Sequence, residues 1–382
     1  MAPKALHFTF KLGPLRHEAA IILKQEMLSK GGEAALHWEV LKGRDHTFAL
    51  LMGTLAQYRR LLPRLYQQPF GLRQLGKELK ASLEKLSGGE RSRFLKCGGG
   101  RTMTLGEQTL VMGILNVTPD SFSDGGQLNS PGEALEAALE MESLGADIID
   151  IGAESTRPAA KAAISTEEPL SRSPFSARQG EARVTAQEEM DRLLPVLEKV
   201  VKYVKVPVSV DTYKGEVAGE ALRMGAHIIN DVSGLEDPTM AKVVADHGAA
   251  VVIMHSTPES HSNIIEGIVG TLGKRIEKAL DAGIGDDQII VDPGVGFAKD
   301  LNQDLTIINR LDMLKALDYP VLLGTSRKSV IGGVLDSSTG RRLEGTAATL
   351  AVGILRGADI VRVHDVGEMV KVVKMTEAIL HA

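Results

Sequence analysis

Eight short β-rich runs recur from Val111 to the C-terminus, and a helical segment separates each run from the next. Repeated strand–helix units predict a parallel sheet, because parallel neighbours need a crossover connection. Eight such units in about 270 residues fit a closed (β/α)8 barrel, a TIM barrel, better than an open doubly wound sheet. The runs are VMGILNV, DIIDIGA, VPVSVDT, HIINDVS, AAVVIMH, IIVDPGVG, PVLLGTS and DIVRVHD.

The first ninety residues lack this repeat and mix strand and helix patterns. Apolar residues alternate over His7–Leu12, which predicts a strand, and over Leu36–Val40 and Thr47–Met52, which predicts a hairpin. Helical spacing predicts helices over Leu15–Met27 and Thr54–Leu86, the second one broken near its two prolines. We therefore predict a small α+β N-terminal module ahead of the barrel.

Two irregular stretches interrupt these patterns. The first, SGGERSRFLKCGGGR, runs from Ser87 to Arg101 and has the composition of a linker. The predicted domains are the α+β module at 1–90, a linker and barrel-closing segment at 91–110, and the barrel at 111–382. The second stretch, Ala159 to Arg183, has about 25 residues and is long for a strand-to-helix loop. It is either a functional lid or a disordered insertion.

Charge and composition narrow the class of protein. A net charge of −5 and a pI near 6.1 give no general attraction to nucleic acid or to anionic membranes. The single cysteine, Cys97, cannot form an internal disulfide, which suits a reducing compartment. No apolar run approaches the roughly 18 residues of a membrane-spanning helix. We expect a cytoplasmic protein that binds neither nucleic acid nor membranes.

Polar residues follow nearly every predicted strand of the barrel. In barrel enzymes the active site lies at the carboxyl ends of the strands, and a scaffold built only for stability would not need such a ring. In strand order the ring contains Asn116; Glu154, Ser155, Thr156 and Arg157; Asp211; Asn230 and Asp231; His255; Asp292; Ser326, Arg327, Lys328 and Ser329; and Arg362 and His364.

Arg362 and His364 lie two residues apart on the last predicted strand, so their side chains point to the same face. A guanidinium beside an imidazole suits a phosphate group. A lone histidine on a strand is more often structural, but its pairing with Arg362 at a strand end favours anion binding. Asp365 falls on the opposite face, where a structural salt bridge is its expected role.

The turn after the seventh predicted strand, GTSRKS, can start a helix at Ser329. The free N–H groups of a helix start favour an anion, which the Ser329 hydroxyl would also bind, and Lys328 could reach back over the pocket. Many helices begin in this way, so the turn is a weak signal by itself. Its place beside Arg362 and Asn116 strengthens it.

Asp211, Asn230, Asp292 and Lys328 combine hydrogen-bond acceptors and donors around one centre. Such a set can bind a flat heterocycle with adjacent donor and acceptor edges, a pterin or a purine, through charge-assisted hydrogen bonds worth about 1.5–3 kcal/mol each. The alternative is a buried polar network that only orders the barrel.

The sequence contains no HExxH motif and no pair of cysteines, so a zinc site is not expected. A magnesium ion is bound by oxygen atoms, and it usually keeps only one or two protein ligands besides substrate phosphates and water. Asn116 and the carboxylates of the loop that follows it fit that description.

Seven motifs of the barrel region resemble the dihydropteroate synthases of folate biosynthesis. They occur in the family's order over Val111–Ala382. Related folate-dependent methyltransferases share weaker versions of the pterin pocket, whereas the DSFSDGG loop and the SRKS turn favour the synthase. The motifs are GILNVTPDSFSDGG, DIGAESTRP, SVDTYK, INDVSG, DPGVGF, GTSRKS and RVHDV.

The resemblance implies condensation of 6-hydroxymethyl-7,8-dihydropterin pyrophosphate with p-aminobenzoate to give 7,8-dihydropteroate and pyrophosphate. It also implies the role of each matched residue. Asp211, Asn230, Asp292 and Lys328 would hold the pterin, with Met254 as an apolar contact; Asn116 would bind Mg²⁺ on the pyrophosphate, with Arg157, Arg362 and His364 near it; Thr156, Pro158, Phe297, Lys328 and Ser329 would form the aminobenzoate site.

The implied chemistry is dissociative, because an electron-rich pterin can stabilise the cation left when pyrophosphate departs. Arg362, His364 and magnesium would offset the charge on the departing oxygen, and carboxylates, chiefly Asp292, would favour the cation. The glycine-rich loop after Asn116 would close over the cation. Within it Phe122 would exclude water, and Asp124 would add a ligand to the magnesium.

Two alternatives stay open on the sequence. One is a methyltransferase that moves a methyl group from methyltetrahydrofolate to a corrinoid, and the other is a non-catalytic pterin-binding paralogue whose long loop blocks the second substrate. Residues 1–90 match nothing in the minimal family and would form an oligomerisation or partner-binding module. The family resemblance also implies a homodimer whose only other partners are its small-molecule substrates.

Overall fold

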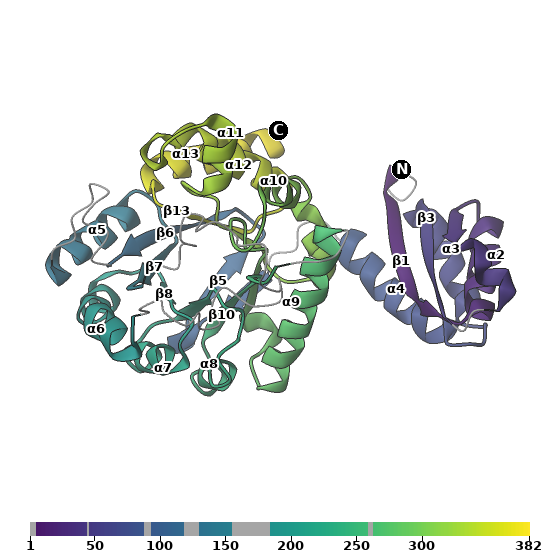
Figure 1. Cartoon of the computed structure of the whole chain (residues 1–382), viewed down its shortest axis with the longest axis horizontal. Helices are drawn as coiled ribbons and strands as arrows, with labels where there is room; N and C mark the ends of the chain where they lie inside the picture. Colours follow the sequence, from purple (N-terminus) through teal and green to yellow (C-terminus); the bar gives the residue numbers. More distant parts are fainter. Residues whose placement is uncertain (1–4, 44–45, 88–92, 118–129, 155–183, 259–262) are drawn as a thin grey trace, which may run out of the picture. The chain divides into compact units, whose positions relative to one another are not determined.

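The structure is a computed structural model, and it describes residues 5–43, 46–87, 93–117, 130–154, 184–258 and 263–382. The chain forms two compact units, Met1–Glu90 and Arg91–Ala382 (Figure 1). Each unit has a hydrophobic core of its own. Each can therefore bury its apolar residues without the other.

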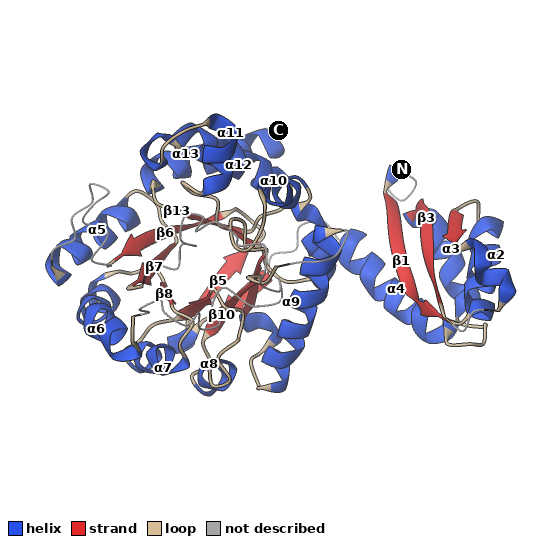
Figure 2. Cartoon of the chain, viewed as in Figure 1, coloured by secondary structure: helices blue, strands red, loops and turns tan. Residues whose placement is uncertain are grey.

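Eight parallel strands form the sheet of the second unit and confirm the predicted barrel (Figure 2). Their order is β11-β10-β9-β8-β7-β6-β13-β12, and a parallel bridge between Val291 and Val321 brings the two ends of this order together. The ring is therefore nearly closed. The strands are β6 (Leu110–Asn116), β7 (Ile148–Gly152), β8 (Val208–Asp211), β9 (Ile228–Asp231), β10 (Ala250–Met254), β11 (Ile289–Asp292), β12 (Leu322–Leu323) and β13 (Ile360–Val363).

Helices connect consecutive strands and surround the sheet (Figure 1). Side chains cap several helix starts; for example, a capping box pairs Thr185 with Glu188 at the start of α6, and another pairs Asp300 with Gln303 at the start of α10. The helices are α5 (Pro131–Ser143), α6 (Ala186–Tyr203), α7 (Gly215–Arg223), α8 (Met240–Asp246), α9 (Ile264–Asp281), α10 (Leu301–Asn309), α11 (Ser329–Leu335), α12 (Leu343–Leu355) and α13 (Val366–Leu380).

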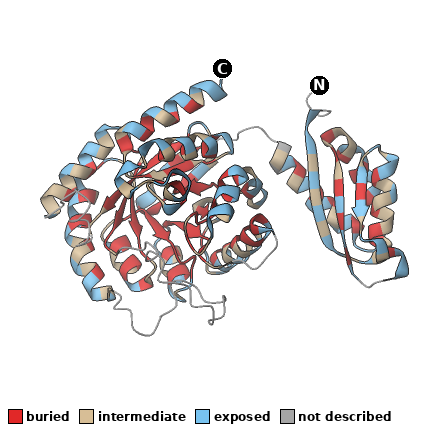
Figure 3. Ribbon diagram, turned by 45° about the horizontal axis from the view of Figure 1, so that its top comes forward, coloured by how far each residue is buried: buried red, intermediate tan, exposed pale blue. Residues whose placement is uncertain are grey.

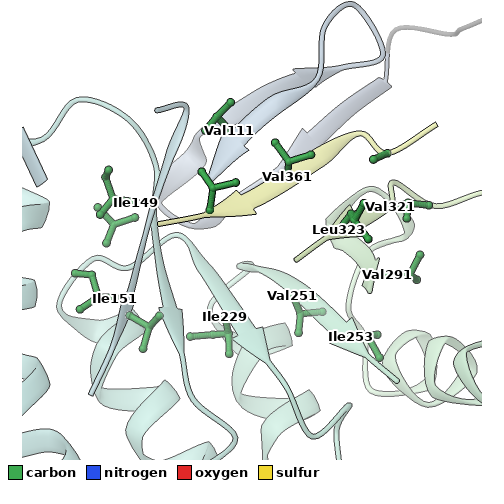
Figure 4. Packing of buried hydrophobic residues seen from close by; sticks show 14 of the residues in the cluster. Val111, Ile149, Ile151, Ile229, Val251, Ile253, Val291, Val321, Leu323 and Val361 are labelled. Carbon is green, nitrogen blue, oxygen red and sulfur yellow. The ribbon is translucent and has the colours of Figure 1, made fainter. Parts of the chain in front are cut away.

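One face of each strand packs against the helices. Val111, Ile149, Ile151 and Val361 belong to one buried cluster (Figure 4). Helix residues such as Leu197 of α6 belong to the same cluster. The buried positions form a continuous layer between strands and helices (Figure 3). Because side chains alternate along a strand, the residues between these positions must point into the barrel.

The inward-facing residues at the amino ends of the strands form a second, separate apolar cluster. It contains Leu110, Met112, Ile148, Ile228, Ala250, Val252, Ile290, Leu322 and Ile360. A two-stranded antiparallel hairpin of β4 (Arg93–Lys96) and β5 (Thr102–Leu105) adds Leu95 and Met103 to the same cluster. The hairpin therefore closes this end of the barrel.

The expectation of a linker over Ser87–Arg101 is wrong for its second half, where the structure has strand β4 and a turn at Gly98–Gly100. Glycine and charge gave the stretch the composition of a linker. Leu95 is nevertheless 2% exposed, and Arg93 pairs with Asp318 at 2.5 Å. Tertiary contacts with the barrel fix this segment.

The N-terminal unit is the predicted α+β module, with a three-stranded antiparallel sheet in the order β1-β3-β2. Apolar residues from one face of the sheet and from the helices form its core, with Tyr58 fully buried. The Tyr58 hydroxyl donates to the Leu51 carbonyl at 2.9 Å, which satisfies its polar atom. The elements are β1 (His7–Leu15), α2 (His17–Ser29), β2 (Glu33–Leu36), β3 (Thr47–Thr54), α3 (Leu55–Leu65) and α4 (Leu72–Ser87).

Two details of this unit differ from the prediction. The alternating run after Leu36 is not a strand, because β2 ends there and a 3-10 turn follows at Trp38–Lys42, with the His37 side chain accepting from the Glu39 N–H. Pro63 does not break a helix but lies within α3, whereas the break near Pro69 separates α3 from α4.

Across the described part of the chain, no helix combines the length and apolar character needed to cross a membrane.

Candidate active site

The interior of the barrel changes character toward the carboxyl ends of the strands. Several polar side chains there follow, two positions later on the same strand, a residue of the apolar cluster at the amino ends. Because side chains alternate along a strand, the polar residue and the apolar residue both face inward. The pairs are Ile148 and Asp150, Ile228 and Asn230, Ile290 and Asp292, and Ile360 and Arg362. Asp211 at the end of β8 adds another carboxylate, and the residue two positions before it is the buried Ser209. The structure therefore gathers polar side chains at one end of a largely apolar barrel interior.

Arg362 is at the centre of this polar layer. Its Nε donates to Asp150 Oδ2 at 2.6 Å, and its Nη2 donates to Asp211 Oδ2 at 2.7 Å. Asp150 is fully buried, and Asp211 is 5% exposed. Buried charges need partners in this way, because taking an unpaired ion out of water costs several kcal/mol.

Asn230 joins the same network by donating from Nδ2 to Asp150 Oδ2 at 3.1 Å. The other carboxylate oxygens, Oδ1 of Asp150 and Oδ1 of Asp211, have no hydrogen-bond partner within the described residues. An unsatisfied buried acceptor is costly, and it can accept from a ligand donor. The site is therefore prepared for a group that presents N–H donors to two carboxylates.

The two carboxylates around Arg362 carry more negative charge than one guanidinium can balance. Burial, opposed by Arg362 and reinforced by Asp150, raises the pKa of Asp211 to about 7. Burial, opposed by the neighbouring Lys328, also raises the pKa of Asp292. A ligand with cationic or N–H donor character would stabilise the ionised forms.

Asp292 and Lys328 form the second part of the layer. Asp292 Oδ1 accepts from the Gly294 N–H at 2.6 Å, and Lys328 Nζ donates to the Val295 carbonyl at 2.6 Å. Burial, opposed mainly by Asp292, lowers the pKa of Lys328 to about 8. Lys328 therefore stays mostly protonated at pH 7 but loses its proton more readily than an exposed lysine.

An apolar wall stands beside these charges. Met254 and Phe297 pack together with Val232 and, at the edge, Tyr213 in one small cluster. Lys328 Nζ lies 4.8 Å from the centre of the Phe297 ring, within the range of a cation–π contact. A flat ring bound between Met254 and the carboxylates would meet both an apolar surface and hydrogen-bond acceptors.

His364 and Ser329 lie at the rim rather than in the buried layer. His364 Nδ1 is 3.0 Å from Ser326 Oγ, which also accepts from the His364 N–H at 3.1 Å. Ser329 is the first residue of α11, and Lys328 occupies the N-cap position. Asp365 forms the salt bridge expected of it, since its two oxygens accept from Nε and Nη2 of Arg327.

Asn116 ends β6 next to the carboxylates. A Cβ placed on Gly152 would lie 3.6 Å from both Asn116 Oδ1 and Asp211 Cβ, so Asn116 and Asp211 flank the same glycine. The amide oxygen of Asn116 is a suitable ligand for magnesium, which prefers oxygen atoms. No group of three or more His, Cys, Asp or Glu side chains suited to a metal occurs among the described residues. These residues fit a metal that takes one protein ligand and completes its shell with substrate oxygens and water.

Five predicted site residues lie outside the described residues. They are Phe122 and Asp124 of the glycine-rich loop, and Thr156, Arg157 and Pro158 after β7. The long 159–183 stretch also lies there. Asp211, Asn230, Asp292, Lys328 and Arg362 are brought together, with Met254 and Phe297 beside them.

Asp150 is a site residue that the sequence reasoning missed. It lies inside the run DIIDIGA, where an aspartate between isoleucines could have signalled an inward-facing polar position. Lys299 and Asp304 were missed as well. Both follow the DPGVGF motif at positions that composition alone does not distinguish from a helix surface.

Comparison with known proteins places this geometry in context. A family model described as "Pterin binding enzyme" matches residues 112–174 and 173–364. The dihydropteroate synthase of Bacillus subtilis is 47% identical over 277 residues, which cover 72% of this chain and 90% of that protein. A solved dihydropteroate synthase of Xanthomonas albilineans with 4-aminobenzoic acid is 36% identical, with a TM-score of 0.67, and it covers 76% of this chain and all of that one at 100%.

Relatives of greater length also match the N-terminal unit. A probable bifunctional folylpolyglutamate synthase/dihydropteroate synthase of Halobacterium salinarum is 39% identical over 386 residues. The match covers 99% of this chain and 43% of that protein. The module at 1–90 is therefore shared with a longer protein, whereas the Bacillus subtilis relative matches a region of barrel length.

Proposed function

This chain belongs to the dihydropteroate synthase family of pterin-binding enzymes, and from that membership we propose how its residues carry out the reaction. The enzyme is a transferase that condenses 6-hydroxymethyl-7,8-dihydropterin pyrophosphate with p-aminobenzoate, giving 7,8-dihydropteroate and pyrophosphate. The resemblance predicted from the barrel motifs is confirmed by these relatives.

We propose that the pterin binds across Asp150, Asp211, Asn230 and Asp292. The observation that carries this proposal is that two carboxylate oxygens, Oδ1 of Asp150 and Oδ1 of Asp211, accept no hydrogen bond from the part of the chain that the structure describes. The amino-pyrimidine edge of a pterin presents adjacent N–H donors, which would satisfy both. Met254 would contact the ring face, and Lys328 would donate to a ring acceptor.

The reaction we propose is dissociative. The carbon–oxygen bond to pyrophosphate breaks first, and its electron pair leaves with the oxygen, so positive charge develops on the pterin. The buried carboxylates, chiefly Asp292, stabilise that charge because they are already fixed in place and largely shielded from water. The amine of p-aminobenzoate then attacks the carbon and loses a proton.

Arg362 and His364 would bind the departing pyrophosphate. The two ion pairs of Arg362 use Nε and Nη2, and a guanidinium carries further N–H donors on Nη1. Proximity of Asn116 to Asp211 supports a magnesium ion there, bound through Asn116 Oδ1 and, we propose, Asp124. Such an ion supplies charge neutralisation to phosphate oxygens when bound.

The aminobenzoate side of the site would lie beside Phe297, Lys328 and Ser329. Phe297 offers a ring face, and Ser329 with the N–H groups at the start of α11 would bind the carboxylate. Thr156, Arg157 and Pro158 remain predictions for this side, and Phe122 remains one for the loop that excludes water.

The experiment that tests the function is release of pyrophosphate from dihydropterin pyrophosphate by the purified chain with magnesium. Release that depends on p-aminobenzoate and yields dihydropteroate is the expected result. Tight pterin binding without release would support the corrinoid methyltransferase or the non-catalytic paralogue. Omitting magnesium tests the metal, and activity in the presence of a chelator would remove it from the proposal.

We also propose that the enzyme is a cytoplasmic homodimer. Exposed apolar side chains on two adjacent helices support the second copy, Val352 and Leu355 on α12 and Met375 and Ile379 on α13. The single cysteine, Cys97, is a buried free thiol in the β4–β5 hairpin that closes the barrel, which agrees with a reducing compartment. Light scattering of the purified chain would give its mass in solution, and a monomer would contradict the dimer.

A further inference from the structure

The loop between β11 and α10 carries three backbone conformations that most residues avoid. Gly294, Gly296 and Ala298 have φ values of 69°, 83° and 50°, so every second residue of this stretch is left-handed. Ala298 carries a Cβ, which makes its conformation costly, by about 1–2 kcal/mol. A loop of this kind persists only when contacts around it hold it in place.

Lys299 supplies three of those contacts from one atom. Its Nζ donates to the carbonyls of Gly294 at 2.9 Å, Phe297 at 2.9 Å and His255 at 3.1 Å. An ammonium group has three N–H donors, so each hydrogen can have its own acceptor. The side chain thereby joins both ends of the left-handed stretch to the end of β10.

Asp304 of α10 makes a contact of a different kind. It is 3% exposed, and its Oδ1 accepts from the Gly296 N–H at 2.8 Å. The carbonyl of the same peptide unit belongs to Val295 and accepts from Lys328 Nζ at 2.6 Å. One peptide plane is therefore held between Asp304 on one side and Lys328 on the other.

The side chain that this loop presents to the site is Phe297. Its ring is 7% exposed, packs with Met254 and Val232, and lies under Lys328 Nζ. Lys299 donates to the carbonyl of Phe297 itself. Asp304 instead accepts from the Gly296 N–H, in the peptide unit whose carbonyl binds Lys328. The two charged residues thus act on different neighbours within one loop.

We propose that Lys299 is a positioning residue for the aminobenzoate side of the site, which it orders by fixing the backbone of Phe297. It does not touch the reacting atoms. The proposal rests on the function proposed above, because it assumes that the Phe297 ring borders p-aminobenzoate. Asp304 has a different role, because it holds the peptide unit that binds Lys328, and Lys328 contacts the pterin as well as p-aminobenzoate.

The first test is a steady-state comparison of Lys299→Met with the unaltered chain. We expect KM for p-aminobenzoate to rise by about tenfold, because the charge-assisted hydrogen bonds that fix the backbone of Phe297 are lost. KM for dihydropterin pyrophosphate should rise less, because Asp150, Asp211 and Asn230 are untouched and Asp292 keeps its hydrogen bond from the Gly294 N–H. Asp304→Leu should raise both KM values.

Matched controls separate positioning from general stability. Lys278 also donates from Nζ to a loop carbonyl, that of Leu235, but in the loop after β9. Lys278→Met should lower the melting temperature without raising KM for p-aminobenzoate selectively. Lys299→Gln keeps two N–H donors and should give an intermediate KM; it also replaces Lys299→Met if that variant does not fold.

Chemical rescue gives a readout that a purely structural role would not produce. Lys299→Ala leaves a space beside three carbonyls, and a small primary ammonium ion can enter that space and donate to them. Ethylammonium should restore KM for p-aminobenzoate toward its original value, whereas tetramethylammonium, which has no N–H donors, should not. Equal restoration by both ions would overturn the proposal.

Each remaining outcome is also decisive. Equal rises in both KM values for Lys299→Met, or no rise at all, would overturn the positioning role. Failure of the unaltered chain to form dihydropteroate would instead overturn the proposed function, and it would be seen before any variant is measured.

Discussion

Arg362 Nε lies 2.6 Å from Asp150 Oδ2, although 212 residues separate the two in the chain. Arg362 is on β13 and Asp150 is on β7, and both strands pair with β6, which lies between them. The contact therefore spans three neighbouring strands within the barrel. It links the second barrel strand along the chain to the last one through a pair of buried charges.

Removal of one partner from this pair is expected to destabilise the barrel. Asp150→Ala should lower the free energy of unfolding by about 3–5 kcal/mol, because Arg362 would stay buried with a single carboxylate. Chemical denaturation measures the change. Glu220→Ala, which breaks the exposed pair with Arg223, should cost no more than about 1 kcal/mol and serves as the control. Similar losses in the two variants would contradict a special role for the buried pair.

Asp211 should release a proton when a pterin binds near neutral pH. Its pKa is raised to about 7, so the folded chain binds this proton more tightly than the unfolded chain does. Its stabilising contribution is therefore present at low pH and is lost as the pH rises from about 4 to about 7. N–H donors of the pterin would favour the ionised form and displace the proton.

Calorimetry of 6-hydroxymethyl-7,8-dihydropterin binding in buffers of different ionisation enthalpy measures that proton. We expect release at pH 6, little release at pH 8, and none in Asp211→Asn. The ligand lacks pyrophosphate, so its own phosphate groups cannot contribute. The absence of proton release at pH 6 would contradict a protonated Asp211 in the free enzyme.

Asp292→Asn should reduce kcat/KM by an amount equivalent to about 2–5 kcal/mol, because it removes the negative charge from a buried, paired group. The amide oxygen of asparagine can still accept from the Gly294 N–H, so the loop should keep its shape. Asp300→Asn is the matched control, since Asp300 is an exposed N-cap and asparagine caps equally well. An unchanged kcat/KM in Asp292→Asn would remove Asp292 from the mechanism.

Ser329→Ala should raise KM for p-aminobenzoate more than KM for the pterin substrate. The hydroxyl at the first residue of α11 would otherwise bind the carboxylate, whereas the pterin is held by residues deeper in the barrel. Steady-state kinetics with each substrate varied in turn provide the comparison. Ser338→Ala, an exposed serine that precedes the 3-10 turn Thr339–Arg341, should change neither value. Equal effects on both substrates would contradict the assignment of Ser329.

Two truncations test where the barrel unit begins. A chain that starts at Arg91 keeps β4 and should retain the melting temperature and kinetics of the barrel. A chain that starts at Gly98 loses β4, the burial of Leu95, worth roughly 1.5–3 kcal/mol, and the Arg93–Asp318 pair. It should melt at a lower temperature. Equal melting temperatures would mean that β4 does not contribute to the stability of the barrel.

The repeat of strands and helices was enough to predict the barrel, because strand period and crossover length are local properties of the chain. All eight predicted runs contain a strand of the parallel sheet. Local pattern failed where tertiary contacts decide. Leu95 is in a stretch that reads as a linker, yet it packs under the barrel, and Trp38 alternates like a strand residue but lies where β2 has already ended.

The sequence by itself determined the family and the identity of most candidate site residues, since long motifs such as GILNVTPDSFSDGG and GTSRKS are read directly from the chain. Which charges meet was decided only by the tertiary structure. Asp150, Lys299 and Asp304 gain their places through contacts with residues distant in the chain or through a left-handed loop, and no local period encodes such contacts. Closure of the barrel brings Asp150 and Arg362 together, and burial there shifts the pKa of Asp211 and Lys328.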